Sequence, residues 1–198
     1  MYTPEHFSVD DRQDLLAFMR QYNFAALVNV RDGKTTATHA PLVVREDGDR
    51  IALLGHVAKA NDHWKSLAAG GEVLVIFTGP HGYVSPSLYE SKLAVPTWNY
   101  TAVHAYGTPA IVDAEPALRA LIEVSDPDYR KQFGELPEDF RAKMIASVVA
   151  FEIQVDRLEG KYKLSQNRPI GDQMRVAEAF ERTELGEFMK GRLSRKRP

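Results

Sequence analysis

Hydrophobic and polar residues alternate along much of this chain with the period of two that is typical of β-strands. Short alternating runs occupy residues 25–31, 35–44 and 50–54, and Asp-Gly dipeptides at 32–33 and 47–48 separate them. An Asp-Gly pair between two such runs predicts a tight hairpin. The first part of the chain is therefore predicted to form an antiparallel meander.

Further strands are predicted at 72–78, 95–112, 148–155 and 160–166. The run 72–78 is almost wholly apolar, which indicates a central position in the sheet. The segments 79–82 and 85–87 are rich in Gly, Pro and Ser, so a turn and an irregular stretch are expected there.

Helical periodicity appears between and after these strands. Ser8 is predicted to cap a first helix, with Asp11 three residues later, and helices are expected at 61–68, 113–124 and 137–145 and in the segment from about 169 to Gly191. Strands joined by hairpins, with helices inserted and at the ends, predict an α+β domain built on a closed or nearly closed antiparallel barrel. One domain is expected over residues 1–198, ending in a basic tail at 190–198.

Composition narrows the classes of function. The chain has 198 residues, 44% hydrophobic and 26% charged, with a formal net charge of −2. This charge gives no global attraction to nucleic acid or to anionic membranes. The absence of cysteine excludes disulfides, thiolate nucleophiles and iron–sulfur clusters. Without a secretory signal pattern or an apolar run of membrane-spanning length, a soluble cytoplasmic protein is expected.

The strand predicted at 95–112 has an unusual side-chain pattern. One face carries Trp98, Tyr100, His104 and Tyr106, and the other carries Thr97, Asn99, Thr101 and Val103. Neither face is a plain apolar stripe. Hydrogen-bonding aromatic residues in this arrangement are typical of a pocket for a flat ligand with polar edges, or of an interface beside one.

Two other segments gather polar side chains. His56 and Lys59 precede Asn61 at the start of a predicted helix, where backbone amides and charge-assisted hydrogen bonds suit a phosphate. A capped helix with a solvated lysine is an equally good interpretation. The second segment, at the end of the last predicted strand, can bind a heterocycle edge and a phosphate or can be a solvated strand end; it contains Lys161, Lys163, Ser165, Gln166, Asn167 and Arg168.

Other catalytic or metal-binding patterns are absent from the sequence. The six histidines form neither His-x-His nor His-Glu-x-x-His, so no metal site is predicted. No Gly-x-Ser-x-Gly elbow occurs, and Ser85 and Ser87 are interpreted as turn-stabilising residues.

Several of these runs together resemble the PaiB family, whose members are described as FMN-binding negative transcriptional regulators. The runs are Val-Pro-Thr-Trp-Asn-Tyr at 95–100, Gly-Lys-Tyr-Lys-Leu-Ser-Gln-Asn-Arg at 160–168, Thr-His-Ala-Pro-Leu at 38–42 and Gly-His-Val-Ala-Lys-Ala-Asn at 55–61. The resemblance covers nearly the whole chain, in order, and the motifs are jointly specific.

The resemblance implies an FMN-binding split barrel that forms a homodimer, with the flavin near the subunit interface. His39, Pro41 and Leu42 are then expected along the isoalloxazine edge, and His56, Lys59 and Asn61 near the phosphate. The remaining implied contacts close the pocket, in part from the other subunit, or add polar groups; they are Trp98, Asn99, Tyr100, His104, Lys163, Ser165, Gln166 and Asn167.

The chain departs from the family pattern at two positions. Asp62 stands where a proline usually follows the asparagine, and its carboxylate is expected to repel a nearby phosphate. Leu88 stands where tryptophan usually follows the Ser-Pro-Ser run.

Three functions follow as alternatives. A transcriptional regulator is implied by the resemblance, yet the sequence has no helix-turn-helix, zinc finger or basic stripe beyond its tail, so direct DNA binding is not predicted. A flavin-dependent oxidoreductase, like the flavin reductases and pyridoxine-phosphate oxidases, is the second, with Tyr100 and His104 as the side chains to test. A purely structural protein is the third. Haem in place of flavin, with His81 or His104 as axial ligand, is a variant of the cofactor prediction.

Overall fold

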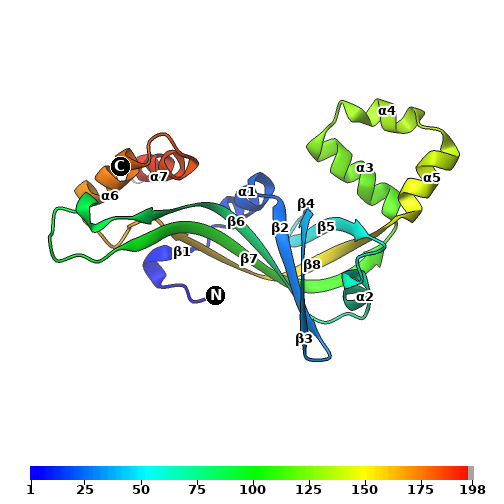
Figure 1. Cartoon of the computed structure of the whole chain (residues 1–198), viewed down its shortest axis with the longest axis horizontal. Helices are drawn as coiled ribbons and strands as arrows, with labels where there is room; N and C mark the ends of the chain where they lie inside the picture. The colour runs from blue at the N-terminus through cyan, green and yellow to red at the C-terminus, as the bar shows by residue number, and fades with distance from the viewer. Residues whose placement is uncertain (196–198) are drawn as a thin grey trace. The chain divides into compact units, whose positions relative to one another are not determined.

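The computed structural model describes residues 1–195, which form two compact units (Figure 1). Unit 1 comprises Met1–Leu15, Thr78–Val103 and the chain from Glu159 onward, and unit 2 comprises Leu16–Phe77 and His104–Leu158. The strands follow the order β3-β2-β6-β7-β8-β5-β4, with β1 paired to β8. The long strands β6 (Val73–Val84), β7 (Thr97–Val112) and β8 (Val148–Lys163) contribute to both units.

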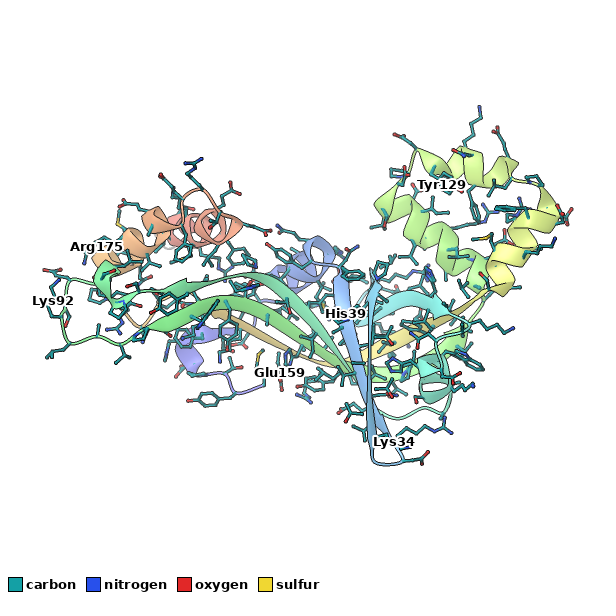
Figure 2. All side chains as sticks on the ribbon, viewed as in Figure 1. Lys34, His39, Lys92, Tyr129, Glu159 and Arg175 are labelled. Carbon is teal, nitrogen blue, oxygen red and sulfur yellow. The ribbon has the colours of Figure 1, made fainter. Side chains whose placement is uncertain are left out.

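Two hairpins organise unit 2. Strands β2 (Phe24–Arg31) and β3 (Lys34–Pro41) pair along their whole length, and Lys34 follows the tight turn (Figure 2). Asp32 and Gly33 have φ values of 52° and 72° there, as a two-residue hairpin turn requires. The second hairpin joins β4 (Val43–Asp47) to β5 (Arg50–Ala58), which in turn pairs with β8 from Ile51↔Val155 to Ala58↔Val148.

A helical segment covers one face of these strands in unit 2. Helix α3 (Ala114–Ser125) packs Ala117 and Leu121 against Leu54 of β5 and Ala150 of β8. Helices α4 (Tyr129–Glu135) and α5 (Glu138–Ala146) follow it, and Figure 2 labels Tyr129 at the start of α4. The short helix α2 (His63–Ala68) follows β5 after a short connection that contains Lys59 and Asn61.

Unit 1 combines the two ends of the chain. Strand β1 (Ser8–Val9) pairs with the end of β8 at Ser8↔Lys161 and Val9↔Gly160. The C-terminal helices α6 (Ile170–Ala179) and α7 (Glu184–Arg195) lie beside each other (Figure 1). The short helices η1 (Glu5–Phe7) and η2 (Pro86–Leu88) complete the unit. The predicted basic tail continues at 196–198, outside the described residues.

The sequence predicted most elements, and the α+β antiparallel class is confirmed. Asp113 caps α3 as expected, since its carboxylate accepts a hydrogen bond from the Glu115 amide at 3.2 Å. The predicted cap of α1 (Arg12–Gln21) by Ser8 was wrong, because Ser8 lies in β1. The carboxylate of Asp11 instead accepts a hydrogen bond from the Asp14 amide at 2.9 Å.

Other differences concern where strands begin and end. The predicted turn at 79–82 lies inside β6, and the predicted strands at 148–155 and 160–166 are one strand, β8. The single strand predicted at 35–44 is divided at Leu42 into β3 and β4. Helix α4 was not predicted, because its seven residues are too few for a periodic signal.

Candidate functional site

The residues that the sequence singled out divide between the two units. Those of unit 2 are His39, Pro41, Leu42, His56, Lys59, Asn61 and His104. Those of unit 1 are Trp98, Asn99, Tyr100, Lys163, Ser165, Gln166 and Asn167.

The three residues predicted at the isoalloxazine edge differ in exposure; His39 and Pro41 lie in β3, and Leu42 follows it. His39 (labelled in Figure 2) is exposed, and its ring stacks on that of Phe24 with a centroid distance of 6.0 Å. Pro41 is half-buried. Leu42 is buried, and its side chain fills the space above Gly55. Of this set, His39 is therefore the side chain most accessible to a ligand.

A closed hydrogen-bond network joins α2 to the first hairpin. Asn61 accepts from the His63 amide at 3.1 Å and donates through Nδ2 to Thr38 Oγ1 at 3.1 Å. The buried His63 ring contacts Thr38 Oγ1 through Nδ1 at 2.8 Å and Asn29 Oδ1 through Nε2 at 3.0 Å. These partners fit a neutral imidazole that donates from Nε2 and accepts at Nδ1. The N-cap position of α2 is Asp62, one residue after the predicted Asn61, and the Asn61 side chain is already occupied by its bonds to His63 and Thr38.

His63 and Asn29 were missed by the sequence analysis. No sequence pattern points to either residue, because nothing in the spacing of residues 29, 38 and 63 indicates that three elements bring them together. Burial lowers the pKa of His63, since the charged ring would lose water and gain no carboxylate.

Acid should destabilise the protein through its buried histidines. Burial lowers the pKa of both His56 and His63 from 6.5, so the unfolded chain binds protons more readily than the folded one. Stability is therefore complete above about pH 6.5 and declines below it, by at most about 1.4 kcal/mol per pH unit for each histidine. Urea unfolding at pH 7.5 and 5.5 measures this slope. His63→Gln should reduce it, whereas the exposed His39→Gln should keep it; equal slopes in all three proteins would contradict the assignment.

Lys59 lies between β5 and α2 with its side chain exposed. Its backbone is fixed, because its amide donates to Ser147 O at 2.8 Å and its carbonyl accepts from Trp64 Nε1 at 3.0 Å. The Lys59 side chain has no hydrogen-bond or ion-pair partner among residues 1–195. The ammonium group is therefore available to an anion while its backbone is held in place.

The expected electrostatics at the start of α2 need two corrections. The helix has six residues rather than eight, and Asn61 already uses its first amide, which weakens the helix-terminus argument for a phosphate. The carboxylate of Asp62 does not face an anion alone, because Lys65 pairs with it at 2.6 Å. The exposed ammonium of Lys59 is thus the group in this segment that best suits an anion.

His56 and His104 occupy different environments in unit 2. His56 pairs across strands with Ala150, and cross-strand partners share a face, so the His56 ring lies on the face that α3 covers. Its Nδ1 is buried and has no hydrogen-bond partner among the described residues. The rings of His104 and Tyr106 are in edge contact, with their centroids 6.3 Å apart. The guanidinium of Arg157 lies 3.6 Å from the centre of the Tyr106 ring.

Unit 1 carries an exposed aromatic surface on β6 and β7. Trp98 is 53% exposed. The centroid of its ring lies 6.1 Å from that of Tyr83 and 6.4 Å from that of His81. The opposite face of β7 is buried, since Asn99, Thr101 and Val103 have no exposed surface. The aromatic face therefore offers flat rings for stacking, as the alternation along this strand predicted.

Several polar residues of unit 1 hold the chain together instead of facing a ligand. Asn99 Nδ2 donates to Ser165 Oγ at 3.0 Å, and both residues are buried. Gln166 accepts from the Leu164 amide at 2.6 Å and donates to the Tyr162 carbonyl. These contacts fix the turn after β8, where Ser165 has a φ of 67°. Asn167, by contrast, is exposed.

The two lysines near the end of β8 differ in accessibility. Lys161 is buried and donates to the Tyr2 carbonyl at 2.8 Å, with the Tyr100 ring 5.2 Å away. Lys163 donates to the Trp98 carbonyl at 2.9 Å and to the Thr97 hydroxyl. Burial, and then the charge of Lys161, lower the pKa of Lys163.

No helix within residues 1–195 is both long and apolar enough to span a membrane.

Comparison with known proteins assigns the chain to a family. Residues 1–157 match the model of the family described as "Putative FMN-binding domain". The chain belongs to this family. Among the family's relatives, Protease synthase and sporulation protein PAI 2 of Bacillus subtilis is 34% identical over 206 residues, covering 98% of this chain and 99% of that protein. The PaiB resemblance is thereby confirmed, and family membership assigns FMN as the cofactor.

Solved structures confirm the fold of this family member. The FAD and heme binding protein of Mycobacterium smegmatis has a TM-score of 0.59 at 22% identity, covering 79% of this chain and 73% of that one. The conserved hypothetical protein Rv2991 of Mycobacterium tuberculosis has a TM-score of 0.58 at 14% identity, covering 85% and 94%. The predicted α+β class with an antiparallel split β-barrel and flanking helices is confirmed.

Proposed function

We propose that the protein is a homodimeric, FMN-dependent flavoprotein that lowers gene expression without reading DNA itself. The observation that carries the cofactor site is the fixed backbone and available ammonium of Lys59, within a motif of an FMN-binding family. The name of the B. subtilis relative, which refers to protease synthesis and sporulation, supports a regulatory role.

The residues of unit 2 fit the polar part of FMN. Lys59 supplies charge for the phosphate, and the exposed His39 ring offers a hydrogen-bonding group near the edge of the flavin. His56 is proposed to use its buried Nδ1, which has no partner among the described residues, toward the cofactor. Asn61 contributes by holding the start of α2 in place. When bound, FMN supplies electron transfer, and the protein supplies its orientation.

The residues of unit 1 are proposed as a second set of flavin contacts. Trp98 and Tyr100 offer ring faces, and the exposed Asn167 offers an amide. Lys163 is anchored to the backbone of Trp98, so it positions this strand as well as adding charge. Asn99, Ser165 and Gln166 support the same turn from within.

The absorption spectrum tests the cofactor site directly. Purified protein is incubated with FMN or with riboflavin, desalted and scanned in the visible range. FMN should be retained and riboflavin lost, because riboflavin lacks the phosphate that Lys59 attracts. Equal retention of both would contradict a phosphate site, and loss of both would contradict flavin binding. Light scattering of the same samples measures whether the protein is a dimer.

Regulation without DNA reading predicts weak, non-specific DNA binding. The net charge of −2 gives little counterion release on a duplex. Fluorescence anisotropy with promoter-sized duplexes at low and moderate salt should show no sequence preference, while deletion of the gene should raise transcript levels of its targets. Tight, sequence-specific binding would overturn this part of the proposal.

An FMN-dependent oxidoreductase is the second candidate, favoured by the exposed rings of Trp98, Tyr83 and His81. Such a surface suits a second planar molecule beside a flavin. Consumption of NADH or NADPH by the FMN-loaded protein, with a quinone or free flavin as acceptor, tests it. If neither nucleotide is consumed, a nicotinamide-dependent reductase is excluded.

A further inference from the structure

Unit 1 contains a cavity that shares one residue, the supporting Gln166, with the proposed flavin site. Its volume is about 110 Å³, and it lies among β1, the turn after β8 and the helices α6 and α7. Apolar walls come from Val9, Leu164, Met189 and Leu193, and polar groups come from Gln173 and Arg192. Figure 1 shows α6 and α7, which supply Gln173 and the residues Met189, Arg192 and Leu193 of this lining, beside each other.

Gln173 offers an acceptor to this space. The residue is 9% exposed, and its Nε2 donates to the Arg168 carbonyl at 2.7 Å. That bond fixes the amide and leaves Oε1 without a partner among the described residues. A carboxamide oxygen held in this way accepts a hydrogen bond from a hydroxyl or an amine. The ligand must therefore carry such a donor.

Arg192 offers the opposite chemistry. Its Nη1 donates to Asp14, and its guanidinium lies 5.0 Å from the centre of the Tyr162 ring. A guanidinium has five N–H donors in a fixed plane, so one carboxylate does not exhaust it. Because Asp14 already balances its charge, Arg192 provides hydrogen bonds to an acid more than strong net attraction.

The volume limits the size of the ligand. A cavity of 150 Å³ accommodates benzene, so one of about 110 Å³ takes a molecule of roughly six non-hydrogen atoms or fewer. Four apolar side chains along the walls suit a short carbon stem between the two polar ends. The side chains of His6 and Ser8, which are exposed, also line this cavity and mark its way in.

We propose that this cavity binds a two- to three-carbon carboxylic acid that carries a hydroxyl or an amine. The carboxylate contacts Arg192, the donor contacts Gln173 Oε1, and the carbon stem packs against the apolar walls. Such a site does not include the proposed ring contacts of the flavin, Trp98 and Tyr100. Its occupancy acts on the turn that holds Asn99 and Gln166, because Leu164 and Gln166 line the same cavity. A small acid is therefore an effector candidate for unit 1.

Amide NMR titration of the full chain with three matched compounds tests the proposal. Lactate has both groups, propionate lacks the hydroxyl, and lactamide lacks the charge. Lactate should bind with a dissociation constant on the order of 1 mM, as expected for so small a ligand. Propionate and lactamide should each bind about five- to tenfold more weakly, since one hydrogen bond is lost. Equal affinities, or shifts that map away from α6 and α7, would overturn the proposal.

Three variants separate recognition from simple structural damage. Gln173→Met should erase the preference for lactate over propionate while leaving propionate binding unchanged, whereas a merely structural role would weaken both compounds equally. Leu193→Phe fills the cavity and should abolish the shifts caused by all three compounds. Lys190→Gln, an exposed change on α7, should alter nothing. Unchanged lactate binding in Leu193→Phe would place the ligand elsewhere and refute the site.

Discussion

Replacing Lys59 with methionine is expected to weaken FMN binding by about 10- to 100-fold. The change removes a charge-assisted contact to phosphate, which contributes about 1.5–3 kcal/mol, and keeps a side chain of similar length. Because the backbone of Lys59 is held by Ser147 and Trp64, the fold should survive. Fluorescence titration of FMN measures the affinity, and thermal unfolding without flavin checks the fold.

Lys65→Met is the matched control for this experiment. Lys65 lies in α2, close in sequence to Lys59, and its side chain is exposed. Its ammonium group, however, already pairs with the Asp62 carboxylate at 2.6 Å. Its loss should change FMN affinity by less than about threefold, since exposed ion pairs contribute little. If both variants lose affinity equally, the attraction is general positive charge around α2 and not a contact of Lys59.

Gly107→Ala is expected to destabilise the protein by about 3–5 kcal/mol, or to prevent folding. A Cβ at this position of β7 would lie 2.0 Å from the carbonyl oxygen of Gln154 and 2.9 Å from Ile153. Backbone atoms of the neighbouring strand cannot retreat as a flexible side chain can, so the clash forces two central strands apart. Urea unfolding measures the loss.

Gly134→Ala provides the opposite expectation in the same unit. No atom lies within 4 Å of a Cβ added at Gly134, which is inside α4. The substitution should therefore stabilise the protein by up to about 1 kcal/mol, through the higher helix propensity of alanine. A similar loss in both variants would show that the clash at Gly107 is not the cause.

Local sequence signals predicted the hairpins and most helices because their causes are local. Asp32-Gly33 requires only the positive φ values of its own turn, and Asp113 caps the helix that follows it. Strand lengths were less predictable, because β6 and β8 continue through Gly-containing segments that pairing with other strands keeps extended. Those partners are distant in sequence.

For the candidate site too, the sequence predicted local features and missed contacts between distant segments. Alternation along β7 predicted which residues share a face, and the burial of Asn99 and Thr101 opposite Trp98 agrees with it. The side chains of Asn61, Ser165 and Gln166 form hydrogen bonds within the protein, with Thr38, Asn99 and the Tyr162 carbonyl respectively. Sequence alone did not show these bonds, because the fold determines which groups meet. The roles of the individual side chains toward FMN remain predictions.

The pairing of β1 with β8 has a consequence for synthesis on the ribosome. Lys161 contacts Tyr2 across 159 positions of the chain, and β1 has no other strand partner among the described residues. The first ten residues must therefore wait until most of the protein has been translated before they find their place. Contacts so remote in sequence slow folding and leave apolar surface open in the meantime. Nascent chains stalled before Gly160 should accordingly be more sensitive to protease, and more dependent on chaperones, than the released protein.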